Sequence, residues 1–155
     1  MKRILFICHG NICRSPMGEM ILKHMLRERG REQEFVVASA ATSTEEIGNP
    51  IYPPARAELA RQGVFVEKRG ARQVTKRDYA AYDLLIAMDY YNVRNLNRML
   101  DGDPEGKIHL LMDYTDRPGE VSDPWYSERF DIAYRDILEG CQGLLNVLLN
   151  EREER

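Results

Sequence analysis

The feature that most constrains the fold is a short, continuous apolar run, ILFI at residues 4–7. Apolar residues at successive positions, without polar alternation, predict a strand that is buried on both faces. A strand of that kind needs helices packed on both sides of its sheet. The rest of the sequence meets this requirement, because strand-like segments alternate with segments of helical pattern.

Further strands are predicted from their apolar content at residues 34–41, 83–88 and 107–114. Helical patterns, bounded by Ser, Thr, Pro or Gly, predict helices at residues 15–30, 54–63, 75–82, 90–100 and 130–150. Residues 115–126 contain Pro, Gly and Asp and are predicted to form a loop, and residues 151–155 form a charged, solvated tail. The alternation predicts an α/β fold: a single domain spanning residues 1–155, with a doubly wound four-stranded parallel sheet and helices on both faces.

Composition excludes several classes of partner. The chain has 155 residues and a net charge of −3, from 22 basic and 25 acidic residues, so it offers no overall charge that would attract nucleic acid or a membrane surface. No apolar run approaches the length of a membrane span, and the segment before Cys8 is too short for a secretory signal. We therefore expect a cytoplasmic protein. Its three cysteines are then catalytic or core thiols in preference to disulfide partners.

The segment CHGNICRSP follows the first strand directly and leads into a helix. In open parallel sheets, ligands bind beyond the carboxyl ends of the strands, where this segment lies. Gly10 and Asn11 tolerate positive φ, so successive backbone N–H groups can converge on one anion. Arg14 can close over that anion with a bidentate guanidinium. The predicted feature is a phosphate-binding loop.

A cysteine at the base of such a loop gains a specific chemistry. The N–H groups, Arg14 and the helix dipole all favour a thiolate at Cys8, which can attack a bound phosphoryl group. Ser15 can hydrogen-bond the sulfur and improve it as a leaving group. Asp123, in the loop after the fourth strand, can protonate the departing oxygen and later activate water. Trp125 and Tyr126 can line the mouth of the site, although half-buried packing is an equal alternative for both.

Purely structural roles remain as alternatives for several of these residues. Asp123 could be only a turn residue before Pro124, and Cys13 only an inert thiol at the start of a helix. Cys141 lies on an apolar helical face and is expected in the core. His9, His24 and His109 do not have the spacing of metal ligands, and no Walker loop occurs in the sequence. These histidines are therefore expected in solvated or core positions and not as metal ligands.

Together, CHGNICRSPM and the distant DPWY resemble the low-molecular-weight protein tyrosine phosphatases, and the likeness extends over nearly the whole chain. The resemblance implies hydrolysis of phosphotyrosine in proteins or peptides through a phosphocysteine on Cys8. It also implies that Arg14 binds phosphate, that Asp123 is the general acid, and that Asn11, Ser15 and Ser39 hold the loop. No metal and no organic cofactor is expected on the same ground. The residues expected to surround the substrate are His9, Gly10, Asn11, Ile12, Cys13, Ser15, Trp125 and Tyr126.

The sequence departs from the family pattern at three places. Glu45 or Glu46 occupies a position that is often aromatic in eukaryotic members, Arg69 stands where some members carry His, and His9 stands where Leu or Thr is common. Separately, three alternatives stay open: a phosphoarginine phosphatase, an arsenate reductase of the same fold, and a phosphoanion-binding module without turnover. Arsenate reduction needs further cysteines, and there is none between Cys13 and Cys141. Ile12 favours a phenyl ring over a guanidinium, because it offers no hydrogen bond.

Overall fold

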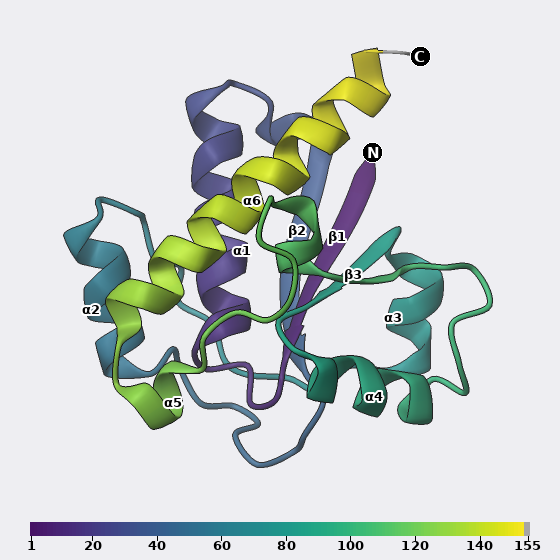
Figure 1. Ribbon diagram of the computed structural model, residues 1–155, viewed down its shortest axis with the longest axis horizontal. Coiled ribbons are helices and arrows are strands. Elements are labelled where there is room, and N and C mark those ends of the chain that lie inside the picture. Colours follow the sequence, from purple (N-terminus) through teal and green to yellow (C-terminus); the bar gives the residue numbers. More distant parts are fainter. Residues whose placement is uncertain (154–155) are drawn as a thin grey trace.

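One parallel sheet organises the molecule, shown as a computed structural model that describes residues 1–153 (Figure 1). Its strands are β1 (Lys2–Cys8), β2 (Phe35–Ala41), β3 (Leu84–Ala87) and β4 (Ile108–Leu110). All neighbours pair in parallel, in the order β2-β1-β3-β4. The predicted four-stranded parallel sheet is therefore confirmed, with β1 at its centre. Residues 154 and 155 of the predicted charged tail lie outside the described residues.

Helices cover both faces of this sheet. They are α1 (Arg14–Glu28), α2 (Pro53–Arg61), α3 (Lys76–Ala81), α4 (Tyr90–Met99), α5 (Pro124–Ser127) and α6 (Phe130–Glu153). Figure 1 shows α1, α2 and α6 on one side, with α3 and α4 on the other. This arrangement confirms the doubly wound fold. Within residues 1–153, no helix combines the length and the apolar character needed to cross a membrane.

Strand β1 contributes to two separate cores. Ile4 and Phe6 belong to the larger hydrophobic cluster, which also contains side chains of α1, α2 and α6. Leu5 and Ile7 belong to a second cluster, with side chains such as Leu96 of α4. All four β1 side chains are fully buried. The continuous apolar run is thus explained, because successive side chains point to opposite faces and both faces are covered.

Two segments differ from the sequence prediction. The strand predicted at 107–114 ends at Leu110, and Leu111–Tyr114 form a 3₁₀ helix, η2. Leu111 and Met112 are both buried, and η2 packs against α6, which a continuing strand would not allow because it turns alternate side chains away. The segment predicted as loop at 115–126 contains the start of α5, which Asp123 caps and Pro124 begins. A further 3₁₀ turn, η1 (Glu32–Glu34), precedes β2.

The carboxyl end of β1 is where the candidate residues gather. The chain leaves Cys8, crosses residues 9–13 and enters α1 at Arg14. Asp89, two residues after β3, caps α4, and Asp123 caps α5. In Figure 1 the loop, the start of α4 and α5 lie together at the lower edge of the molecule.

Candidate active site

The loop after β1 wraps around the sulfur of Cys8. The backbone N–H groups of Asn11 and Ser15 point at Cys8 Sγ, at 3.3 and 3.4 Å, and Ser15 Oγ lies 3.0 Å from it. The residue is only 4% exposed. Asn11 has φ of 58°, the left-handed conformation that lets its N–H turn inward. Gly10 does not have positive φ, contrary to expectation. A Cβ there would lie 3.4 Å from Glu46 Cγ.

Asn11 is held from both ends of its side-chain amide. Its Nδ2 donates to Ser15 Oγ at 2.7 Å and to Ser39 Oγ at 2.9 Å. Its Oδ1 accepts from the backbone N–H of Arg72 at 3.3 Å and from Arg69 Nη2. Arg69 Nη2 also donates to the Asn11 carbonyl, at 2.8 Å. Asn11 and Ser15 are fully buried, so these bonds fix an otherwise costly backbone conformation. Arg69 thus stabilises the loop through hydrogen bonds.

Arg14 is oriented by partners from other elements. Its Nη2 donates to Asp89 Oδ2 at 2.7 Å, and its Nη1 donates to the carbonyl of Val121 at 3.1 Å. Burial by itself lowers the pKa of this guanidinium, but nearby negative charges on Cys8, Asp123 and Asp89 raise it above its usual value. The sequence analysis did not predict Asp89. Its signal was the Asp89-x-x-Asn92 capping box, in which Asp89 Oδ1 accepts from the Asn92 N–H.

Asp123 lies beside Arg14 and remains open to solvent. Its Oδ2 is 3.6 Å from Arg14 Nη2, and its side chain is 37% exposed. Its Oδ1 accepts the backbone N–H of Trp125 at 3.0 Å, as the cap of α5. The structure therefore brings together the thiol, the guanidinium and the carboxyl group that were singled out from three positions in the sequence.

The remaining candidates lie around the mouth or beneath it. His9 Nε2 lies 3.0 Å from Glu45 Oε2, and both side chains are more than half exposed. The Trp125 ring lies 5.1 Å from that of Tyr52, and Tyr126 is 85% exposed. Ile12, in contrast, is 8% exposed and belongs to the main hydrophobic cluster. Trp125 and Tyr52 thus form an aromatic pair, and Glu45 places an acidic group beside His9.

All three cysteines are free thiols. Cys13 occupies the N-cap position of α1, makes no side-chain capping hydrogen bond, and is buried. Burial, followed by the charges of Cys8 and Asp123, raises the pKa of the Cys13 thiol to about 12. Cys141 lies in the core, as expected, and burial raises the pKa of its thiol well above the ordinary range. Neither thiol is ionised at neutral pH.

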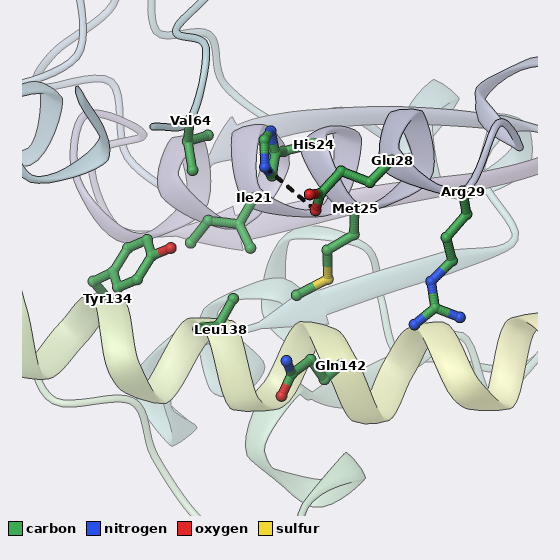
Figure 2. Close-up of a pocket in the computed structure, with 9 residues that line it drawn as sticks. All are labelled: Ile21, His24, Met25, Glu28, Arg29, Val64, Tyr134, Leu138 and Gln142. Carbon is green, nitrogen blue, oxygen red and sulfur yellow. Dashed lines mark ion pairs between the residues drawn. The ribbon is translucent and has the colours of Figure 1, made fainter. Parts of the chain in front are cut away.

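A separate cavity of about 240 Å³ opens between α1 and α6 (Figure 2). Apolar side chains such as Ile21 and Leu138 form part of its wall, and His24 and Glu28 pair within it at 3.3 Å. None of its lining residues belongs to the loop around Cys8. Among residues 1–153, no group of three or more His, Cys, Asp or Glu side chains could hold a metal ion.

Comparisons with known proteins agree with this geometry. The family model of low molecular weight phosphotyrosine protein phosphatase matches residues 3–154. The chain is 34% identical to the low molecular weight protein-tyrosine-phosphatase YfkJ of Bacillus subtilis, over 99% of each chain. It is 35% identical to the mouse low molecular weight phosphotyrosine protein phosphatase, over 93% of this chain and 94% of the relative.

Solved structures give the same result. The crystal structure of YfkJ superposes with a TM-score of 0.94 at 35% identity, over 97% of this chain and 96% of that one. The crystal structure of DARP, drosophila arginine phosphatase, superposes with a TM-score of 0.85 at 32% identity, over 96% of this chain and 98% of that one. With the loop, the fold and these matches in agreement, the chain belongs to the low molecular weight phosphotyrosine protein phosphatase family.

Proposed function

We propose that this chain hydrolyses phosphotyrosine in proteins or peptides, with Cys8 as the nucleophile, Arg14 as the phosphate-binding residue and Asp123 as the general acid. The observation that carries the proposal is the convergence of donors on Cys8 Sγ, beside a buried Arg14. A thiolate in such surroundings is stabilised without losing its access to a bound phosphoryl group.

In the first step, Cys8 Sγ attacks phosphorus and the bond from phosphorus to the phenolic oxygen breaks. Asp123 gives its proton to that oxygen, so tyrosine leaves as a neutral phenol. Arg14 and the loop N–H groups neutralise the charge on the phosphoryl oxygens. The product of this step is a phosphocysteine on Cys8.

In the second step, water attacks the phosphorus of the phosphocysteine, and Asp123 accepts a proton from that water. The bond from phosphorus to sulfur breaks, and Cys8 leaves as a thiolate that accepts a hydrogen bond from Ser15. Inorganic phosphate then departs. The partial exposure of Asp123 supports this step, because water can reach the carboxylate.

The proposal also covers the extent of the catalytic domain and the compartment in which the protein works. A hydrophobic cluster that runs from Ile4 in β1 to Leu149 in α6 supports treatment of residues 1–155 as one catalytic domain. The free thiols Cys8, Cys13 and Cys141 fit a reducing compartment, and we place the protein in the cytoplasm on that ground.

The decisive experiment is turnover of p-nitrophenyl phosphate and of a phosphotyrosine peptide by the purified protein. We expect Cys8→Ser to abolish turnover while still binding phosphate, since a hydroxyl without a neighbouring base is a poor nucleophile. Cys141→Ala serves as the matched control, because it removes a buried thiol on α6 whose hydrogen bond is to Gly18 and not to the loop. A chain that binds phosphate but turns over neither substrate would be a binding module instead.

Phosphoarginine is the second candidate substrate, because the drosophila arginine phosphatase shares this fold at 32% identity. Ile12 argues against it: its side chain is mostly buried in the main cluster, but where it reaches the loop surface it offers no hydrogen bond, and guanidinium N–H groups left unpaired there would cost about 1–3 kcal/mol each. We expect phosphotyrosine to be the better substrate and Ile12→Thr to narrow the difference in kcat/KM. Faster hydrolysis of phosphoarginine by the unmodified protein would reverse the assignment.

A further inference from the structure

A chain of buried hydrogen bonds connects Cys8 to Glu19, which lies outside the loop on α1. Ser39 Oγ donates to Glu19 Oε1 at 2.6 Å, and Asn11 Nδ2 donates to Ser39 Oγ at 2.9 Å. The same Nδ2 donates to Ser15 Oγ at 2.7 Å, and Ser15 Oγ lies 3.0 Å from Cys8 Sγ. Every member is less than 9% exposed, so each is satisfied mainly by the next.

Glu19 sets the direction of the hydrogen bonds that Ser39 makes. An ionised carboxylate can only accept hydrogen bonds, so the hydroxyl proton of Ser39 is committed to Glu19. The oxygen of Ser39 must then accept from Asn11. Asn11 has two hydrogens on Nδ2, and the second one goes to Ser15.

The amide of Asn11 cannot reverse, because its other end faces donors. The backbone N–H of Arg72 and the guanidinium of Arg69 both donate to Oδ1. Neither group can accept a hydrogen bond. Ser15 Oγ therefore receives a hydrogen from Asn11, and its own proton is free for the remaining partner, Cys8 Sγ.

We propose that Glu19 is a positioning residue: by accepting the Ser39 proton it leaves the Ser39 oxygen free to accept from Asn11, and so holds the Asn11 amide where it donates to Ser15 and the proton of Ser15 faces the Cys8 thiolate. The inference rests on the proposed role of Cys8 as nucleophile. It extends the catalytic arrangement to a carboxylate that touches neither substrate nor sulfur and acts only through Ser39, Asn11 and Ser15.

Lys23 holds the other carboxylate oxygen of Glu19. Its Nζ lies 2.6 Å from Glu19 Oε2 and 2.9 Å from Glu67 Oε2. Burial alone lowers the pKa of Lys23, but its hydrogen bonds and charge interactions with Glu19 and Glu67 raise it above the usual value. The ammonium therefore occupies Glu19 Oε2 as a donor and leaves Oε1 to accept from Ser39. The other charged groups near the network, Arg69 beside Asn11 and Arg14 and Asp123 beside the thiol, stay constant in the variants below.

The first test is Glu19→Gln, which keeps the shape of the side chain. The new amide nitrogen cannot face the Lys23 ammonium, because both are donors. It turns to Ser39 instead, so Ser39 accepts there and its proton meets the donor Nδ2 of Asn11. We expect the pH midpoint for alkylation of Cys8 by iodoacetamide, followed on the Cys8 peptide by mass spectrometry, to rise by about one unit, which is about tenfold slower labelling at pH below both midpoints. The rate at high pH should be unchanged.

The second test is rescue by Lys23→Met in the Glu19→Gln background. Without the ammonium, the amide can turn its oxygen toward Ser39 and restore the original direction. The midpoint should return to within about 0.3 units of the unmodified protein. If Glu19 only filled space, a second substitution beside it would not restore anything, so an unrecovered midpoint in a folded double variant overturns the proposal.

Controls separate this inference from the proposed function. Glu28→Gln changes an acid on the same helix that has no bond to the loop, and it should leave the midpoint where it was. Ser15→Ala should raise the midpoint by itself, and adding Glu19→Gln should then cause no further rise. An unchanged midpoint in Ser15→Ala overturns the proposal even if Glu19→Gln fails to fold. Absence of turnover in the unmodified protein would instead refute the proposed function.

Discussion

At the scale of single residues, the contacts of Asp123 allow a substitution that separates its proposed catalytic role from its structural one. Its Oδ1 caps α5 and its Oδ2 approaches Arg14, so Asn can keep the cap but cannot give up a proton. We expect Asp123→Asn to lower kcat by about 10²–10⁴-fold for phenyl phosphate, whose leaving group needs protonation. The loss should be smaller for p-nitrophenyl phosphate, because its leaving group is a weaker base. Steady-state kinetics on both substrates measure the difference.

The control is Asp116→Asn, an exposed carboxyl group in the same loop, which should leave both rates unchanged. Should Asp123→Asn lower the two rates by the same factor, the residue would have a structural role and the general acid would lie elsewhere.

Cys13 is expected to protect Cys8 from irreversible oxidation. Its pKa of about 12 keeps it a thiol at neutral pH, so peroxide reacts first with Cys8. Oxidation of Cys8 to sulfenic acid removes one of the charges that hold the Cys13 proton, and Cys13 can then form a disulfide with it. After peroxide and then dithiothreitol, the unmodified protein should regain most of its starting activity, and Cys13→Ser should regain little. Cys141→Ala, which lacks a buried thiol elsewhere, should recover normally; recovery by Cys13→Ser as well would exclude the protective role.

Which site residues the sequence predicts depends on how far apart they lie in the chain. Cys8, Asn11 and Ser15 sit within one short segment, so their spacing indicates a loop around an anion. Asp89 and Glu19 could not be assigned in this way. Their contacts with Arg14 and Ser39 cross between elements, and only the packing of the sheet decides which side chains meet.

At the scale of elements, predictions succeeded where a pattern is local and failed where packing overrides it. The helix predicted at residues 75–82 is present as α3, and a Thr75-x-x-Asp78 capping box begins it. The predicted end of the fourth strand, at residue 114, was wrong. Leu111 and Met112 have the apolar character of a strand, but they are buried in η2, which packs against α6. The short helix α5 was missed, since four residues are too few to show a period.

The packing of α6 against η2 depends on Gly143. A Cβ at this position would lie 1.9 Å from the carbonyl oxygen of Tyr114, which is backbone and cannot rotate away. In an open helix, replacement of Gly by Ala would stabilise by about 1 kcal/mol. Here we expect Gly143→Ala to lower the free energy of unfolding by about 3 kcal/mol, because the helix and η2 must separate.

Urea denaturation at an unchanged m-value measures this loss. The matched control is Asn146→Ala, an exposed position on the same helix, which should change the stability by less than about 0.5 kcal/mol. A Gly143→Ala variant as stable as the control would mean that α6 and η2 can move apart without cost.

At the scale of the whole molecule, the candidate chemistry and most of the stability lie in different places. The two hydrophobic clusters fill both faces of the sheet. The polar groups that are buried beside Cys8 lie instead at the carboxyl edge of the sheet. Arg14, only 4% exposed, lies there with the backbone N–H groups of Asn11 and Ser15, which point at Cys8 Sγ. An oxyanion that binds to Arg14 and these N–H groups should therefore stabilise the folded state as a whole, because the unfolded chain lacks this binding site.

Phosphate at about 100 times its dissociation constant should add about 2.7 kcal/mol to the free energy of unfolding. For a chain of this size that corresponds to a rise in Tm of about 5–10 °C, measurable by calorimetry. Phosphate also stabilises proteins by general exclusion from their surface, so the size of the rise alone is not diagnostic. Arg14→Met, which keeps the length of the side chain but cannot hold an anion, should retain only that general part, whereas Cys8→Ser should keep the full response. An equal rise in Arg14→Met and in the unmodified protein would show that phosphate does not bind at this loop, and the proposed mechanism would lose its first step.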